Sequence, residues 1–217
     1  MILAAGRGSR MQQLTEKIPK PLLRVNNKTL IEYRVEALVS RGISNIVINV
    51  HYYADHIMQL LGNGARFGAS IVYSQEKTLL EVGGGIYHAL PLLGDGIFMT
   101  MNADLWTDFS KNVVLPPTSL AHLIFVDNPA HHPLGDYALS PSGQVIVSSQ
   151  HRLTFSGIAF YHPDFFKDCV AESFPLKALL EKRLPEGVIT GEHYTGLWRD
   201  VGTPERLAMC SNSSFRL

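Results

Sequence analysis

The chain has 217 residues, of which 46% are hydrophobic and 18% are charged. This length and balance are typical of one α/β domain with a substantial core, so we expect a single domain over residues 1–217. Nineteen basic and nineteen acidic side chains cancel. No overall field therefore favours nucleic acid or an anionic membrane, and any phosphate must be bound by a local cluster.

Cysteine usage and hydropathy indicate a cytoplasmic protein without a membrane anchor. Cys169 and Cys210 have no metal-ligand spacing, and two thiols in a chain of this length do not suggest a disulfide scaffold. No apolar run approaches the roughly 20 residues that span a bilayer. The apolar start is too short for a signal peptide and resembles a first strand without a lead-in, so we expect a residue or two to be missing before it.

The first half alternates short buried strands with helices. The helix after Lys28 is well defined, because Thr29 and Glu32 form a capping box and Gly42 follows the last turn. Apolar periodicity predicts the remaining elements in this half. The predicted strands are 2–5, 46–50, 71–73, 97–101 and 123–126, and the predicted helices are 29–41, 55–61 and 85–93.

The second half is richer in strands. Residues 137–139 and 144–147 flank Ser-Pro-Ser-Gly, which predicts a hairpin. A strand at 155–161 and helices at 176–183 and from Thr203-Pro204 onward follow, and residues 211–217 are expected to fray. The fold class is therefore α/β: a Rossmann-like, mostly parallel mixed sheet with helices on both faces, plus a small β-rich part. Ligands of such sheets bind at the carboxyl ends of the strands.

A glycine-rich loop follows the first strand directly. Gly6 and Gly8 let the backbone point its N–H groups at phosphate oxygens, Arg10 adds a forked donor, and Lys20 between two prolines adds a point charge. The Walker loop is absent, and Met11 stands where the dinucleotide fingerprint needs a third glycine. Taken alone, the loop is equally consistent with a tight β–α turn.

Two aspartates far apart in the sequence are candidate metal ligands. Asp104 follows a predicted buried strand, and Asp200 lies in Trp-Arg-Asp-Val-Gly-Thr-Pro-Glu-Arg-Leu. Mg²⁺ in nucleotide sites commonly takes one or two carboxylates together with phosphate oxygens. Separately, Asp104 is better explained as a loop residue and Asp200 as a surface turn, so the metal hypothesis depends on the two acting together.

These segments together resemble the signature of the sugar-1-phosphate nucleotidyltransferase family. The matching residues are Leu-Ala-Ala-Gly-x-Gly-x-Arg-Met at 3–11, Leu-Thr at 14–15, Pro-Lys-Pro-Leu-Leu at 19–23, Asn-Ala-Asp at 102–104, and the segment around Asp200. They cover the beginning, middle and end of the chain in the family's order. The departures are Gln13, where many members have proline, and Ala103, where the family has glycine.

The resemblance implies an enzyme that joins a nucleoside triphosphate to a sugar 1-phosphate by in-line attack, with Mg²⁺ and release of pyrophosphate. Positioning and charge neutralisation would supply the catalysis. The implied residues are Arg10, Lys20 and Asp104 as catalytic; Asp104 and Asp200 as metal ligands; Leu3, Ala4, Ala5, Gly6, Arg7, Gly8, Lys20, Glu81, Gly83 and Gly84 as nucleotide-binding; and Asn102, Gly135, Asp136, Ser156 and Gly157 as substrate-binding.

Two further segments resemble the subgroup that transfers a uridylyl group from UTP to N-acetylmuramate 1-phosphate in cell-wall sugar recycling. Leu-Glu-Val-Gly-Gly-Gly at 80–85 resembles its base loop, with Val82 in place of the subgroup's threonine; glycines at a helix start let a flat base lie on the backbone. Residues 128–139 and 154–158 match its sugar-side loop and strand. The resemblance thus implies that residues 1–126 bind mainly nucleotide, while residues 127–210 bind sugar and supply the second metal motif.

Some assignments remain open at this point. His131 and His132 are adjacent and lack a third ligand at suitable spacing, so a loop role is favoured over a metal site. The Glu-Lys-Pro segment that many relatives carry is absent; Arg152 and Lys177 are candidates to replace its lysine, and nothing in the sequence chooses between them. For Asp136, two roles remain: its carboxylate can accept a hydrogen bond from a sugar hydroxyl, or it can order the turn in which it lies.

Several functions compete with uridylyl transfer to a muramyl sugar. Formation of GDP-mannose, dTDP-glucose or UDP-glucose uses similar motifs, and choline-phosphate cytidylyl transfer is another alternative. A non-catalytic nucleotide-sugar-binding regulator is disfavoured, because Lys20, Asp104 and Asp200 are all present. The expected partners are UTP and a sugar 1-phosphate, with no nucleic acid and no membrane, and the protein is expected to be a monomer or homodimer.

Overall fold

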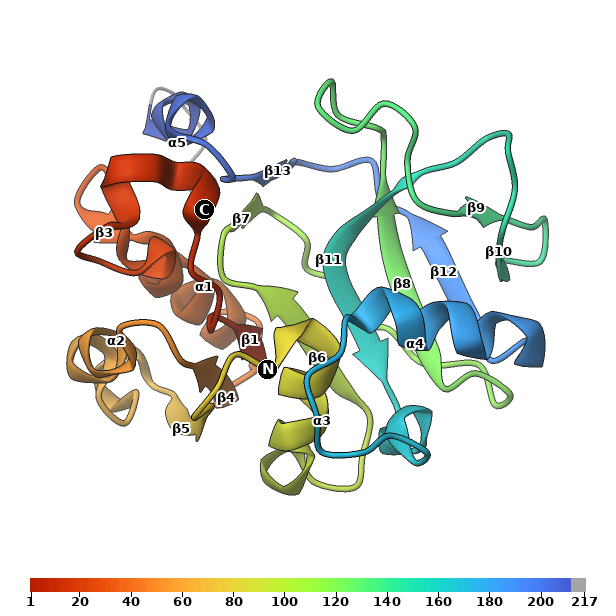
Figure 1. Cartoon of the computed structure of the whole chain (residues 1–217), viewed down its shortest axis with the longest axis horizontal. Coiled ribbons are helices and arrows are strands. Elements are labelled where there is room, and N and C mark those ends of the chain that lie inside the picture. Colours follow the sequence, from red (N-terminus) through yellow and green to blue (C-terminus); the bar gives the residue numbers. More distant parts are fainter. Residues whose placement is uncertain (212–217) are drawn as a thin grey trace.

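The computed structural model describes residues 1–211 and centres on one seven-stranded sheet (Figure 1). The spatial order is β12-β8-β11-β6-β1-β4-β5. β11 runs antiparallel to both of its neighbours, and the other pairs are parallel. The strands are β1 (Ile2–Leu3), β4 (Asn45–Val50), β5 (Ser70–Gln75), β6 (Phe98–Asn102), β8 (Ala121–Val126), β11 (Thr154–Tyr161) and β12 (Ile189–His193).

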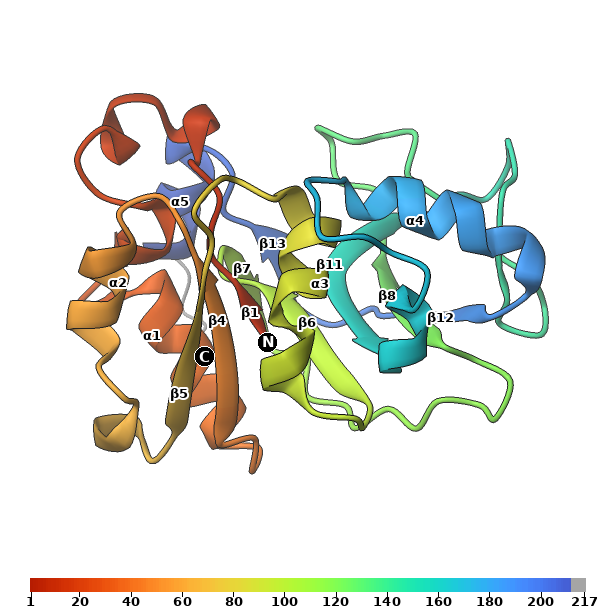
Figure 2. The ribbon, with the colours of Figure 1, turned by 60° about the horizontal axis from the view of Figure 1, so that its bottom comes forward.

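Helices cover both faces of this sheet because its central strands are apolar on both sides. In β4, Ile46 and Ile48 pack with α1 (Leu30–Val39) and α2 (Ala54–Leu61), whereas Val47 belongs to the cluster containing α3 and α4 residues. Helix α3 spans Glu81–Leu93 and α4 spans Leu176–Arg183. Figure 2 shows α1 and α2 on one side of β4 and α3 on the other. The predicted fold class is thus confirmed.

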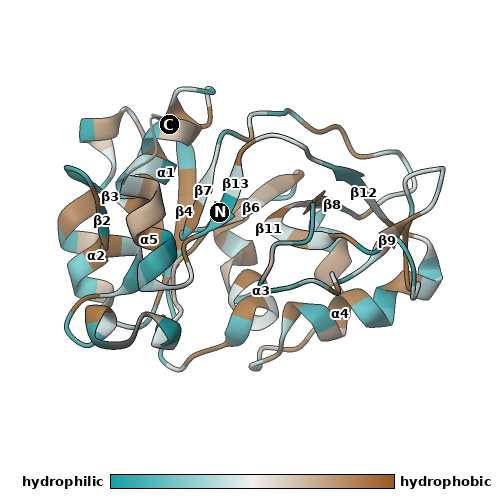
Figure 3. Ribbon diagram, turned by 90° about the horizontal axis from the view of Figure 1, so that it is seen from above, coloured by the Kyte–Doolittle hydropathy of each residue, from teal (hydrophilic) through white to brown (hydrophobic). Residues whose placement is uncertain are grey.

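Hydropathy follows the same layering. In Figure 3, β4 is mostly hydrophobic, while α4 carries hydrophilic residues along its length. Within residues 1–211, no helix is long and apolar enough to cross a membrane.

Short strand pairs complete the fold. They are β2 (Arg24–Val25) with β3 (Lys28–Thr29), β7 (Leu105–Thr107) with β13 (Trp198–Asp200), and β9 (Ala138–Leu139) with β10 (Val145–Ile146). The last helix, α5 (Pro204–Ser211), lies beside β2 and the 3₁₀ helix at Ser9–Thr15 (Figure 1). Their contact is a small apolar cluster that joins the two ends of the sequence and includes Met11, Leu23, Val25, Trp106, Val201 and Cys210.

Most predicted elements are present, with three differences. Helix α1 has its capping box at Thr29 and Glu32 but ends at Val39, before the turn at Gly42. Helix α3 begins at Glu81, so its predicted start at Gly85 is wrong. Strands β2, β3, β7, β12 and β13 were not predicted. Residues 211–217 were expected to fray. Ser211 is the last residue of α5, and residues 212–217 lie outside the described part of the chain.

Candidate active site

A cavity of about 860 Å³ opens at the carboxyl ends of β1 and β6. These strands are parallel neighbours, so the segments that follow them, residues 4–10 and 103–104, emerge at the same edge of the sheet. This is where open α/β sheets bind ligands. The cavity is also lined from helix α3, strand β11, helix α4 and the segment around Asp200.

The phosphate loop, defined here as residues 4–10, forms one wall of this cavity. Gly8 has a φ of +66°, a left-handed conformation that favours glycine. A Cβ added there would also lie 2.8 Å from Cβ of Lys20, so the loop can approach the lysine stem only without a side chain. Arg10, in the short 3₁₀ helix that follows, is exposed and lines the cavity.

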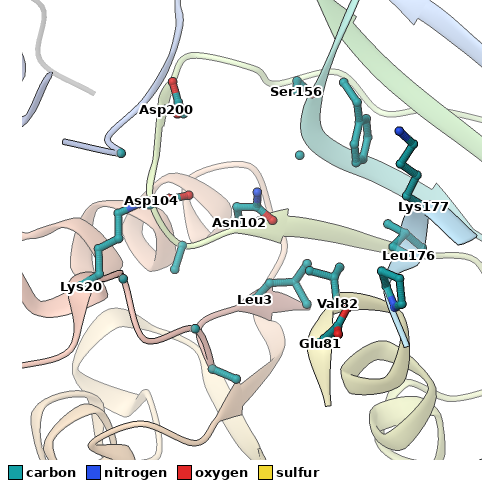
Figure 4. Close-up of a pocket in the computed structure, with 18 of the residues that line it drawn as sticks. Leu3, Lys20, Glu81, Val82, Asn102, Asp104, Ser156, Leu176, Lys177 and Asp200 are labelled. Atoms are coloured by element: carbon teal, nitrogen blue, oxygen red, sulfur yellow. Dashed lines mark hydrogen bonds and ion pairs between the residues drawn. The ribbon is translucent and has the colours of Figure 1, made fainter. Parts of the chain in front are cut away.

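Lys20 is buried and forms an ion pair with Asp104 across the cavity floor (Figure 4). The side chains are only 10% and 22% exposed, respectively. Partial burial strengthens such a pair, because less water screens the two charges. The structure therefore joins two of the three predicted catalytic residues directly.

The second aspartate reaches the same place through the β7–β13 ribbon. Asp200 pairs in register with Leu105, and the N–H of Val201 donates to the carbonyl of Asp104 at 2.9 Å. Asp104 and Asp200 thus lie on adjacent backbones although 96 positions separate them in the sequence. Figure 4 shows both carboxylates at the end of the cavity where Lys20 lies.

Two carboxylates suit a magnesium ion that completes its coordination with phosphate oxygens and water. Within residues 1–211, no cluster of three or more His, Cys, Asp or Glu side chains could hold a metal by itself. Asp200 Oδ1 accepts from Arg206 Nη1 at 2.5 Å and lies 3.2 Å from His131 Nε2. The donor set fits a metal that arrives with a nucleotide.

The predicted base loop divides into two parts. Glu81 and Val82 line the cavity, and Glu81 takes a positive φ of 57° at the start of α3. Gly83 and Gly84 do not line it. A Cβ on Gly83 would lie 2.4 Å from the Phe174 ring, and one on Gly84 would lie 2.4 Å from the carbonyl oxygen of Glu172. These two glycines allow close packing of α3 against residues 172–174.

The sugar-side wall is formed by an irregular part of β11. The pairing of β11 with β8 shifts register between Phe155 and Ile158, and bulges of this kind re-aim side chains. Ser156 and Gly157 lie in this irregularity and line the cavity. A Cβ on Gly157 would lie 2.4 Å from the amide nitrogen of Asn102, so this glycine admits the asparagine side chain.

Asp136 lines the cavity but its carboxylate is engaged by the protein. It accepts the N–H of Phe155 at 2.8 Å and lies 3.1 Å from His132 Nε2. Gly135 lies outside the cavity lining, packed against Asn128 and the backbone of Arg152. These contacts favour the turn-ordering role for Asp136.

The basic rim includes histidines and one lysine. His131, His132 and Lys177 line the cavity. Arg152 does not; its guanidinium donates to the backbone carbonyl of Asp136 at 2.7 Å. Figure 4 shows Lys177 on the opposite side of the cavity from Lys20. Of the two candidates for the sugar phosphate, only Lys177 lines the cavity.

Tyr137 is the lining residue with the clearest perturbed acidity. Burial raises the pKa of its phenol to about 12, and the nearby Glu181 and Asp136 carboxylates add to this effect. The hydroxyl therefore remains protonated near neutral pH and can act as a hydrogen-bond donor.

Most of the predicted site residues meet in this one cavity. Arg7, Gly83, Gly84 and Gly135 do not line it. Sequence reasoning missed Asn49, Trp198 and Arg206, since none of them stands in a motif position with an assigned role. The predicted residues that line it are Leu3, Ala4, Ala5, Gly6, Gly8, Arg10, Lys20, Glu81, Asn102, Asp104, Asp136, Ser156, Gly157 and Asp200.

Comparison with known proteins agrees with this geometry. The profile of the nucleotidyl transferase family matches residues 1–115, more than half of the chain. The chain belongs to the nucleotidyltransferase family. Two similar proteins are N-acetylmuramate alpha-1-phosphate uridylyltransferases: one from Neisseria meningitidis serogroup B, 42% identical over 95% of this chain and 94% of its own, and one from Caulobacter vibrioides, 32% identical over 94% and 92%.

Solved structures share the fold of this nucleotidyltransferase at lower identity. A putative glucose-1-phosphate thymidylyltransferase from Bacillus anthracis superposes with a TM-score of 0.82 at 19% identity, covering 100% of this chain and 96% of that one. HddC from Yersinia pseudotuberculosis, complexed with GMP-PN, gives 0.78 at 21% identity, covering 97% and 96%. These two likenesses establish the fold alone.

Proposed function

We propose that this nucleotidyltransferase transfers the uridylyl group of UTP to N-acetylmuramate 1-phosphate, giving the UDP-sugar and pyrophosphate. The observation that carries the proposal is the 42% identity to a protein of that activity over nearly the whole of both chains. The alignment behind this identity covers 95% of this chain, whereas the family profile matches only residues 1–115.

In the proposed reaction, an oxygen of the sugar phosphate attacks the α-phosphorus of UTP. The bond from that phosphorus to the bridging oxygen breaks, and the electron pair leaves with pyrophosphate. The attacking oxygen is anionic at neutral pH, so no general base is needed. Preorganised positive charge then supplies the rate enhancement.

The roles of individual residues follow from their places in the cavity. Lys20 and Arg10 would contact the triphosphate beside the phosphate loop, while Glu81 and Val82 would lie against the base. Asp104 and Asp200 would hold Mg²⁺, which when bound neutralises phosphate charge and orients the triphosphate. The pairing of Lys20 with Asp104 supports placing phosphate and metal side by side.

The muramyl sugar differs from other candidates by its lactyl carboxylate. A basic rim can attract this group: His131 lies beside Asp200, and His132 and Lys177 also line the cavity. Hexose 1-phosphates have no anionic group besides the phosphate, so they would gain no second contact from such a rim. This feature favours the muramyl substrate over glucose 1-phosphate and mannose 1-phosphate.

A matrix of initial rates tests the proposal. UTP, CTP, GTP and dTTP are each combined with muramyl, glucosaminyl, glucosyl and mannosyl 1-phosphates, with pyrophosphate release as the readout. UTP with N-acetylmuramate 1-phosphate should give the highest kcat/KM. A clear preference for dTTP with glucose 1-phosphate, or for GTP with mannose 1-phosphate, would overturn the substrate assignment.

A further inference from the structure

We propose that Glu76 is a positioning residue that holds the phosphate loop and the base loop, residues 79–82, in one fixed arrangement for nucleotide binding. The residue lies between strand β5 and helix α3 and is not part of the cavity lining. The inference rests on the proposed function, since it presumes a nucleotide in the cavity.

The carboxylate of Glu76 is buried, and its two oxygens accept from Asn49 of β4 and from Leu80 of the base loop. Glu76 as a whole is only 5% exposed. Oε1 accepts from Asn49 Nδ2 at 2.7 Å, and Oε2 accepts from the N–H of Leu80 at 3.1 Å. Asn49 Oδ1 in turn accepts the N–H of Ala4 at 2.9 Å.

This chain of bonds therefore runs from the phosphate loop to the base loop. Ala4 opens the phosphate loop, and Leu80 immediately precedes Glu81 at the start of α3. The backbone of Glu76 is itself fixed, because its N–H donates to the carbonyl of Val50 at 2.9 Å. A displacement of the base loop would break the bond from Leu80 to the carboxylate, and a displacement of the phosphate loop would break the bond from Ala4 to Asn49.

The absence of a charged partner argues that this carboxylate serves its amide donors. Within residues 1–211, no lysine, arginine or histidine forms an ion pair with Glu76. Burying a carboxylate costs free energy unless hydrogen bonds replace its water. Here those bonds come from Leu80 of the base loop and from Asn49, which itself accepts the N–H of Ala4 in the phosphate loop.

The third glycine of the Gly-Gly-Gly run has its explanation in the same network. A Cβ on Gly85 would lie 2.6 Å from Glu76 Oε1 and 3.0 Å from Asn49 Nδ2. Any side chain at this position would therefore push the carboxylate away from its donors. The glycine run thus separates into two residues that pack against 172–174 and one that admits the Glu76–Asn49 bond.

The test replaces the carboxylate with an amide. Glu76→Gln offers one acceptor oxygen and one donor nitrogen, so it cannot accept from both Asn49 and Leu80. We expect UTP to bind about tenfold more weakly by calorimetry, the effect of one lost hydrogen bond to a charged group. The KM for the sugar 1-phosphate at saturating UTP should stay unchanged.

A double variant separates positioning from general stability. In Asn49→Asp/Glu76→Gln the amide nitrogen of residue 76 donates to the new carboxylate at 49, while its oxygen still accepts from Leu80. Every bond of the network is restored with the same net charge, so UTP affinity should return towards wild type. Thr190→Val removes a different buried hydrogen-bonding group, the hydroxyl of Thr190 on β12 outside the cavity lining, and is the matched control for lost stability.

Three results would overturn the inference. The first is that Glu76→Gln binds UTP as tightly as the wild type. The second is that the double variant melts normally but does not regain UTP affinity. The third is that Thr190→Val loses as much UTP affinity as Glu76→Gln. The substrate proposal is judged separately on the wild type. If the wild type prefers another nucleoside triphosphate, that nucleotide replaces UTP in the same comparison.

Discussion

Removing the ammonium group of Lys20 is the most direct perturbation of the candidate site. Lys20→Met keeps an unbranched stem against Gly8, where the space is tight, and deletes only the charge. In the proposed reaction this charge steadies phosphate oxygens as the α-phosphorus is attacked. A preorganised contact of that kind contributes about 2–4 kcal/mol to the transition state, so kcat should fall by about 30- to 1000-fold.

The same substitution breaks the ion pair with Asp104, and burial decides what this costs. Removing one partner of a fully buried pair costs about 3–5 kcal/mol, whereas exposed pairs contribute about 0–1 kcal/mol. The side chains of Lys20 and Asp104 are 10% and 22% exposed, and the carboxylate faces the cavity. We therefore expect the free energy of unfolding to fall by about 1–2 kcal/mol.

Two assays separate these effects. Pyrophosphate release is measured at a temperature where both proteins are fully folded, and urea titration gives the free energy of unfolding. Lys17→Met, at an exposed position outside the cavity, is the control. A kcat within about threefold of wild type would refute the phosphate-contact role, because that is less than 1 kcal/mol.

The remaining predictions concern the metal, the packing of α3 and acid stability. Chelation should abolish turnover and added Mg²⁺ restore it, while Asp200→Asn should need more Mg²⁺ for half-maximal rate; equal requirements would remove Asp200 from the metal site. Gly83→Ala gains about 1 kcal/mol of helix propensity, but the new methyl group meets the Phe174 ring. Urea titration should therefore show that the free energy of unfolding falls by about 1–2 kcal/mol. Gly96→Ala, where the added methyl group meets open space, should show no such loss. Burial lowers the pKa of His122 below its usual 6.5, so the unfolded chain takes up the proton first and stability falls as pH drops below about 6.5. His122→Gln should therefore flatten the dependence of the melting temperature on pH between about 6.5 and 5, and an unchanged slope would contradict this.

Local signals made much of the fold predictable. The capping box at Thr29 and Glu32 and the apolar face of α1 depend only on neighbouring residues, and α4 was predicted with its observed bounds. The start of α3 was misplaced because glycines lower helix propensity. Gly83 and Gly84 are required for close packing against residues 172–174, which lie some 90 positions away in the sequence.

The site shows the same division between local motifs and distant pairings. Lys20, Asp104 and Asp200 could be singled out from motifs, but their meeting could not be derived from spacing. It depends on three-residue strands, β7 and β13, which are too short to give a periodic signal. The role of Glu76 could not be predicted for another reason. In a sequence, a buried glutamate with amide partners cannot be distinguished from a glutamate on the surface.

The β7–β13 ribbon also has a consequence for the order of events as the chain folds. Contacts between residues far apart in sequence carry a large loop-closure entropy and form slowly. The bond between Val201 and Asp104 spans 97 positions, whereas the phosphate loop and Lys20 come together over only a dozen. A refolding chain would thus acquire its phosphate-binding wall before its second carboxylate. Enzymatic activity would return with the last long-range pairing, not with the bulk of the helical structure, and so reports completion of the fold.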